Sequence, residues 1–130
     1  MLDIDTQLAV AREHADKKEE SKAQAVLLEI LKQDPHCSSA LFMLGGSYFC
    51  EQNFDQAVIV FEQLVLMYPA DGKASTGLYN ALWQSDRVVD AMQEIKRFLE
   101  NTDPIAERET VDAYMRIVDT FSDDGKQSVH

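Results

Sequence analysis

The residue types that usually carry catalysis or metal binding are few in this chain of 130 residues, and they are scattered along it. Its histidines and cysteines are His14, His36, His130, Cys37 and Cys50. His36 and Cys37 are adjacent, but zinc needs about four ligands and no second pair stands at ligand spacing. Asp123 and Asp124 lack the alternating oxygen ligands of a calcium loop. We therefore expect no metal, no cofactor and no enzymatic activity.

The charge balance argues against two other classes of function. The chain carries 23 acidic residues against 12 Lys and Arg, a formal net charge of −11. No Lys or Arg occurs from Gln33 to Gly72. Phosphate binding depends on these cations, so we expect no nucleic acid and no anionic membrane as a partner. The acids keep a domain soluble or attract a basic partner.

Nothing in the sequence predicts export or membrane insertion. The first residues include Asp3 and Asp5, whereas a secretory signal would place basic residues before an apolar run. No stretch approaches the ~18 consecutive apolar residues of a spanning helix. Because the two cysteines form no disulfide framework, a reduced, cytoplasmic setting is expected.

A period of 34 residues organises the chain. Ala23, Ala57 and Ala91 keep this spacing, as do Pro35 and Pro69. Such a period with small and aromatic residues at fixed offsets is typical of stacked helix-turn-helix units. Proline forbids continuation of the preceding helix, so Pro35 and Pro69 mark the ends of units.

The middle unit carries the fullest pattern. Its matching residues are Leu41, Leu44, Gly45, Tyr48, Phe54, Ala57, Phe61 and Pro69. This pattern resembles the tetratricopeptide repeat (TPR). The flanking units match less fully: Gln7 stands where a large apolar residue is expected, and Tyr79 fills a position that is small in the other repeats. We expect the two helices around Tyr79 to pack more loosely or to be displaced.

The resemblance implies an all-α fold, a right-handed TPR-like superhelix of antiparallel helix pairs with about seven helices. We expect one domain over residues 1–121. Its repeats are predicted at about 4–37, 38–71 and 72–104, with a capping helix at 105–121 and a disordered tail at 122–130. The helices are predicted at about 4–16, 20–33, 38–51, 54–67, 72–84, 87–101 and 105–121. Asn53 and Asp86 are suited to cap the second helices of the last two repeats.

In TPR-like folds the first helix of each repeat lines a concave groove. The corresponding positions here are Asp5, Leu8, Ala9, Arg12, Ala15 and Asp16, then Ser39, Phe42, Met43, Gly46, Phe49 and Cys50, then Lys73, Thr76, Gly77, Asn80, Trp83 and Gln84. The predicted partner-binding residues among them are Leu8, Arg12, Phe42, Met43, Gly46, Phe49, Asn80 and Trp83. The residues from the middle repeat are large and apolar or glycine, although the last helix could fold over them.

These features predict a non-catalytic protein-interaction module. Its groove would bind an extended or helical apolar segment of a partner, one that could also be basic, in an adaptor- or chaperone-like role. An apolar groove in a chain of this size is similar to that of the small bacterial TPR chaperones of type III secretion. The alternative is a self-associating structural module that forms a homodimer or a larger assembly.

Overall fold

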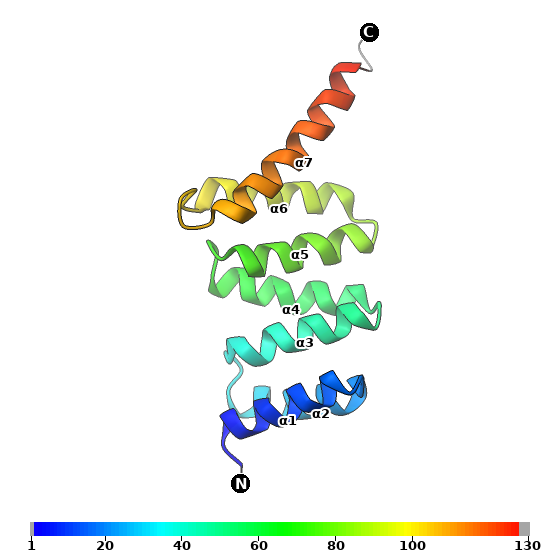
Figure 1. Cartoon of the computed structure of the whole chain (residues 1–130), viewed down its shortest axis with the longest axis vertical. Helices are drawn as coiled ribbons and strands as arrows, with labels where there is room; N and C mark the ends of the chain where they lie inside the picture. The colour runs from blue at the N-terminus through cyan, green and yellow to red at the C-terminus, as the bar shows by residue number, and fades with distance from the viewer. Residues whose placement is uncertain (1, 128–130) are drawn as a thin grey trace.

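The computed structural model describes the backbone of residues 2–127 and the side chains of residues 2–122. Seven α-helices and no strands are found in this part of the chain (Figure 1). The helices are α1 (Ile4–Asp16), α2 (Glu20–Gln33), α3 (Ser38–Cys50), α4 (Phe54–Met67), α5 (Gly72–Gln84), α6 (Val88–Asn101) and α7 (Arg108–Gln127). The first helices of the pairs begin at residues 4, 38 and 72, which reproduces the period of the sequence.

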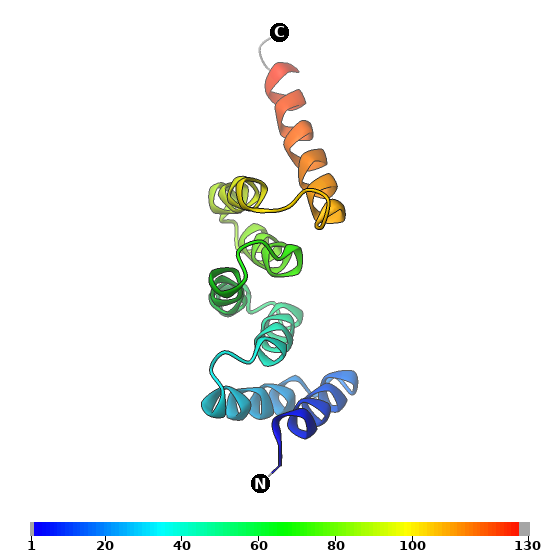
Figure 2. The same cartoon turned by 90° about the vertical axis from the view of Figure 1, so that its left-hand side faces the viewer.

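The helices stack as antiparallel pairs in two columns. Figure 2 shows α1, α3, α5 and α7 along one side of the stack and α2, α4 and α6 along the other. Each pair packs on the next in chain order, so most contacts are local in sequence. We call the surface formed by α1, α3 and α5 the first-helix side.

Small residues set the distance between the helices. Ala23, Ala57 and Ala91 are each at most 1% exposed, which places all three repeated alanines in the core. Ala40 on α3 and Ala74 on α5 are also buried and also 34 residues apart. Because these side chains add little bulk, neighbouring backbones approach closely and larger residues fill the space beside them.

Phe61 of α4 fills such a space. A Cβ atom at Gly45 would stand 2.8 Å from Cζ of the Phe61 ring, and one at Gly77 would also collide with that ring. Phe61 is only 7% exposed. The two glycines on α3 and α5 therefore let one aromatic ring join the second and third repeats.

The turn inside each repeat has the same backbone. Lys18, Gln52 and Asp86 adopt φ of 60°, 63° and 62°. In each repeat the next residue's N–H donates to a carbonyl five residues back, as from Asn53 to Tyr48 at 2.8 Å. This is the Schellman motif that ends many helices, and it satisfies the free carbonyls of the last turn.

The motif corrects both predicted caps. Asn53 occupies the N-cap position of α4, but its side chain makes no capping hydrogen bond. The N-cap of α6 is Arg87, because Asp86 is used for the left-handed turn. The first-turn acids Asp55 and Asp90 lie at these helix N-termini, where the helix dipole favours negative charge.

The last helix differs from its prediction at both ends. It begins at Arg108 instead of 105, because the Asp103 carboxylate accepts the N–H of Ile105 at 2.9 Å and holds residues 103–107 in a turn. It continues to Gln127, so residues 122–127 of the predicted disordered tail are helical. Extending a formed helix requires no apolar face, since the costly step is nucleation. Residues 128–130 of that tail lie outside the described residues.

Candidate functional site

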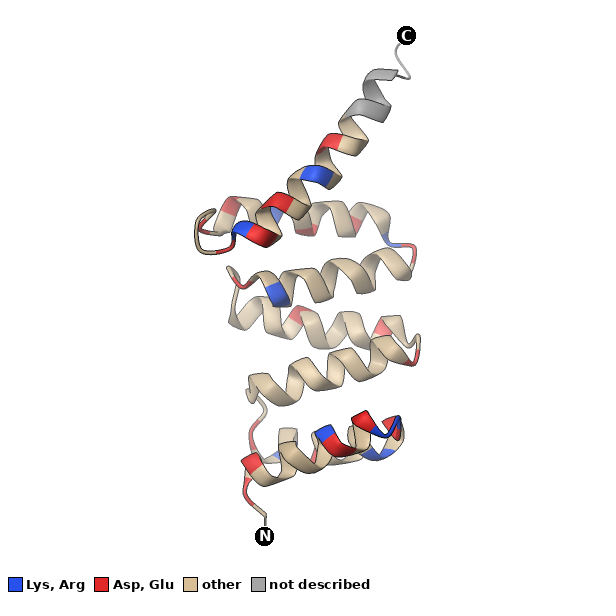
Figure 3. Cartoon of the chain, in the orientation of Figure 1, with Lys and Arg blue, Asp and Glu red and all other residues tan. Residues whose placement is uncertain are grey.

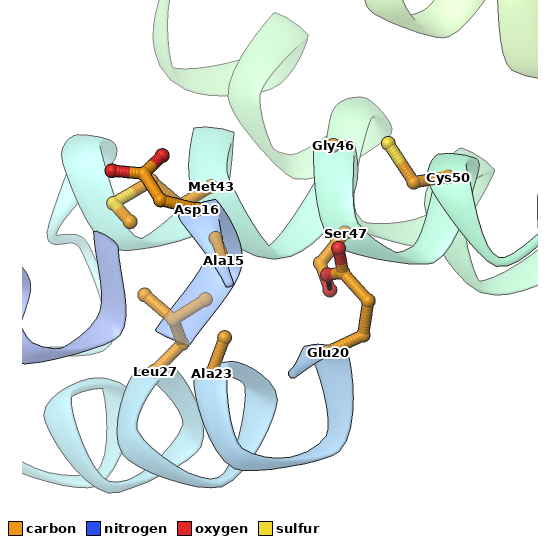
Figure 4. Close-up of a pocket in the computed structure, with 9 residues that line it drawn as sticks. All are labelled: Ala15, Asp16, Glu20, Ala23, Leu27, Met43, Gly46, Ser47 and Cys50. Carbon is orange, nitrogen blue, oxygen red and sulfur yellow. Dashed lines mark hydrogen bonds between the residues drawn. The ribbon is translucent and has the colours of Figure 1, made fainter. Parts of the chain in front are cut away.

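A cavity opens on the first-helix side between the first and second repeats. Its volume is about 260 Å³, and its lining is contributed by α1, α2 and α3 (Figure 4). The lining residues are Ala15, Asp16, Glu20, Ala23, Leu27, Met43, Gly46, Ser47 and Cys50. Met43 and Gly46 belong to the predicted partner-binding set, and Ala15, Asp16 and Cys50 to the wider set of groove positions.

Gly46 leaves this cavity open. Apart from residues 45 and 47 and the backbone of α3 itself, no heavy atom lies within 4 Å of the position that a Cβ at Gly46 would take. Gly77, the other glycine among the groove positions, is different because Phe61 fills the space beside it. A bound backbone can therefore approach α3 at Gly46, whereas Gly77 serves the packing of the repeats.

The large apolar residues that were predicted to line the groove are partly exposed and partly packed against the core. Phe42, Met43 and Phe49 are half-buried and pack against the core with one side. The Phe49 ring meets Phe54 edge-on, with centroids 5.1 Å apart. Leu8 is also half-buried, and Arg12 is exposed. These four residues outside the cavity lining, Leu8, Arg12, Phe42 and Phe49, stay predictions as partner contacts.

Helix α7 reaches the first-helix side only at the third repeat. The Trp83 ring lies 6.1 Å from the Phe121 ring of α7 and 6.1 Å from Tyr79. Trp83 remains 38% exposed, and Asn80 is exposed as well. Beyond this contact α7 projects away from the stack, as Figures 1 and 2 show. The structure thus separates Trp83 and Asn80 from the cavity at Met43 and Gly46.

A polar network borders the cavity, and the sequence analysis missed it. The buried hydroxyl of Ser47 donates to Glu20. The side-chain amide of Gln24 lies 3.0 Å from Ser47 Oγ and 2.9 Å from Glu51 Oε2. The Glu20 carboxylate is thereby held at the edge of the cavity and linked to that of Glu51. The only sequence signal was a serine within the apolar run of α3.

A second network joins α5, α6 and α7. Glu94 is 5% exposed, accepts the Ser75 hydroxyl at 2.6 Å and pairs with Arg97 at 2.6 and 2.7 Å. Hydrogen bonding to Glu94 raises the pKa of Arg97. Ser75 Oγ also lies 2.8 Å from the Tyr114 hydroxyl, and burial raises the pKa of Tyr114 to about 12. This network holds α7 on the stack and lies away from the cavity.

The described residues contain no assembly suited to metal binding. No group of three or more His, Cys, Asp or Glu side chains among them could hold an ion. His14 is half-buried, with Nδ1 3.2 Å from the Glu19 carboxylate, so it ties α1 to α2. Cys37 and Cys50 are free thiols. Within the same residues, no helix combines the length and apolar character needed to cross a bilayer.

Charge is distributed unevenly over the stack. Figure 3 shows α3 without any charged residue and α4 without Lys or Arg. Asp16, Glu20 and Glu51 have no Lys, Arg or His nitrogen within 4.0 Å among the described side chains. The cavity is therefore largely apolar, with one carboxylate contributed by α1 and one by α2.

The helix pairs, their 34-residue period and the Schellman turns define the class of the fold: an all-α, right-handed TPR-like superhelix. Solved structures with a similar fold include MamA from AMB-1, with TM-score 0.66 and 21% identity over 76% of this chain and 58% of MamA. A MamA mutant gives TM-score 0.67 and 18% identity over 75% of this chain and 54% of that protein. The chain thus spans little more than half of MamA.

A third similar structure matches over nearly its whole length. It is the type III secretion translocator chaperone SycD of Yersinia enterocolitica, in an alternative dimer, with TM-score 0.72 and 15% identity over 91% of this chain and 92% of SycD. No family model matches the sequence, and no curated protein matches it. At these identities the similarity concerns the fold, which is TPR-like.

Proposed function

We propose that this chain is a non-catalytic protein-interaction module that holds an apolar segment of another protein, extended or helical, on its first-helix side. The role is that of an adaptor or chaperone. The observation that carries the proposal is the cavity at Met43 and Gly46, which is open, largely apolar and left uncovered by α7. An apolar side chain buried there would contribute about 1.5–3 kcal/mol to binding.

Two further features support this function. The half-exposed rings of Phe42 and Phe49 extend the apolar surface along α3 beyond the cavity. SycD, whose fold is similar over nearly the whole chain, is a translocator chaperone. A TPR-like fold serves many pathways, so this function is inferred from the cavity and its surroundings.

The experiment that tests the proposal is a selection of random phage-displayed peptides on the immobilised chain, followed by fluorescence anisotropy with the selected peptides. Gly46→Leu fills the cavity and should weaken binding by roughly 10-fold or more, the equivalent of one buried side chain. Gly46→Ala is the matched control, since its single methyl leaves most of the cavity open.

The melting temperatures of the two variants show whether a loss of binding is caused by a loss of folding. A Cβ at position 46 meets no neighbouring helix, and both Ala and Leu favour a helix over Gly, so both variants should melt at or above the temperature of the wild type. The proposal is wrong if no peptide is enriched. It is equally wrong if Gly46→Leu, folded, binds the selected peptides as tightly as the wild type.

A self-associating scaffold is the second candidate, and the surface of α4 favours it. Leu66 and Ile59 are 81% and 53% exposed. A hollow of about 290 Å³ beside Ile59 is lined without any Asp, Glu, Lys, Arg or His. Light scattering across a dilution series tests this candidate: a dimer that dissociates on dilution and is abolished by Leu66→Glu supports it. A single-chain mass at every concentration removes it.

A further inference from the structure

The space above Gly46 has no use within the chain itself. Glycine in a helix interior is about 1 kcal/mol less favourable than alanine. At Gly45 and Gly77 this loss is offset, because the Phe61 ring occupies the space that a side chain would need. At Gly46 no atom of the chain uses the space, although the residue lies in the middle of α3. The vacant space is therefore available to a side chain from outside.

The cavity has the size of a site for one side chain. Its volume of about 260 Å³ falls below the ~300–1,000 Å³ of ordinary small-molecule sites. Its walls at Ala23, Leu27 and Met43 are apolar. An aliphatic side chain such as Leu, Ile or Met suits such walls, and a free small molecule would be poorly enclosed.

The acidic end of the same cavity adds a second requirement. Glu20 lines it beside Ser47, and Glu51 is joined to Glu20 through Gln24 and Ser47. Asp16 lies on the opposite side of the cavity, near Met43 (Figure 4). The hydrogen bonds from Ser47 and Gln24 fix two of these carboxylates before any partner arrives. The first-helix side supplies no cation within 4.0 Å of them among the described side chains. A carboxylate has room for several donors, so these groups can still accept hydrogen bonds from a partner.

We propose that the segment bound by this chain carries an aliphatic residue beside a Lys or Arg, with the aliphatic side chain over Gly46 and the cation on Glu20. This inference rests on the proposed function and names the chemistry of its partner. The acidic end fixes the direction of the segment, because its basic residue must lie toward Glu20. A segment with an acidic residue at that place is excluded by repulsion.

The test uses the peptides selected on the full chain. The proposal expects Lys or Arg to be enriched next to the aliphatic residue. Replacing that cation by Gln, measured by fluorescence anisotropy, should weaken binding by about 2- to 5-fold, as expected for a partly exposed ion pair. Glu20→Gln should weaken the original peptide by a similar factor. It should not weaken the Gln-containing peptide further.

Glu100→Gln is the control for net charge, because Glu100 is exposed on α6 and makes the same change of charge. It should leave binding unchanged. Peptides that bind and respond to Gly46→Leu, but contain no enriched cation or bind Glu20→Gln as tightly as the wild type, overturn this inference and leave the proposed function intact. If no peptide binds, or Gly46→Leu has no effect, both the proposed function and this inference fail.

Discussion

The ring of Phe61 on α4 occupies the place of a side chain at Gly77 on α5. The same ring lies against Gly45 on α3, so one residue joins three helices from two repeats. This contact explains why a chain with only 5 glycines places two of them inside helices that need no turn there. It also distinguishes these two glycines from Gly46.

Gly77→Ala should lower the free energy of unfolding by roughly 1–3 kcal/mol, because the added methyl forces the Phe61 ring to move within a packed core. Gly45→Ala should act in the same direction. Gly46→Ala should instead raise the free energy of unfolding by about 0.5–1 kcal/mol, since it gains helix propensity and meets no neighbour. Urea unfolding followed by circular dichroism measures all three.

The double variant Gly77→Ala, Phe61→Leu provides the internal check. Leucine lacks the ring that collides with the new methyl, so the two losses should be less than additive. Additive losses would show that Phe61 does not restrict position 77.

The left-handed turns allow a prediction for stability. Glycine reaches positive φ without the strain that other residues suffer, so Lys18→Gly, Gln52→Gly and Asp86→Gly should each stabilise the fold by roughly 0.5–1 kcal/mol. Lys17→Gly is the control, because Lys17 has φ of −86° and gains nothing from glycine. Thermal melts that rank Lys18→Gly at or below Lys17→Gly would contradict the turn assignment.

The raised pKa of Tyr114 predicts a loss of stability in alkali. Its pKa is about 12 in the folded chain, against an ordinary value of about 10 when unfolded. Below pH 10 both states keep the proton and the full stability is present. Between pH 10 and 12 only the unfolded state loses the proton, so stability falls by about 2–3 kcal/mol over this window.

Tyr114→Phe isolates this effect. Near pH 7 it should reduce the free energy of unfolding by about 1 kcal/mol, because the hydrogen bond to Ser75 is lost. Above pH 10 its stability should fall less steeply than that of the wild type, in urea titrations at a series of pH values. Part of the decline should remain, because burial also raises the pKa of Tyr79. Parallel curves for the two proteins would refute the assignment to Tyr114.

The end of the stack permits a prediction about α7 as a cap. Glu109, Asp112 and Arg116 are exposed and lie on the side of α7 opposite Tyr114, which is buried against the stack. Polar residues at these positions leave the outer face of α7 unsuited to stacking of a further unit. Replacing all three by Leu should cause concentration-dependent association in light scattering, whereas the replacement by Gln, Asn and Gln should not. A monomeric triple-Leu variant would argue against capping.

Sequence reasoning reached the helices because two independent signals coincide. The period of Ala23, Ala57 and Ala91 sets the register, and the prolines mark where units end, so the predicted starts at 4, 38 and 72 agree with the structure. The ends of α7 were harder, because no repeat follows to fix its register. The turn at Asp103 and the helical residues 122–127 have no counterpart in the period.

Other features were beyond the reach of the sequence for identifiable reasons. Lys18, Gln52 and Asp86 share a backbone conformation but no chemistry, and none is the Gly or Asn that usually signals it. Glu94 stands where the other repeats have Val26 and Val60, and only the structure shows its partners. The groove positions were named from the resemblance. The structure adds that Met43 and Gly46 border a cavity and that Trp83 contacts α7. Both facts depend on packing between repeats, which the sequence does not show.

The central claim is that a partner segment occupies the cavity at Met43 and Gly46. Methyl NMR of methionine-labelled chain, titrated with a peptide selected on it, tests this claim most directly, because Met43 lines the cavity and Met92 and Met115 lie on α6 and α7. We expect the Met43 methyl signal to shift in proportion to bound peptide while those of Met92 and Met115 stay in place. A stationary Met43 signal together with a shifting Met115 signal would place the partner on α7 and refute binding in the cavity.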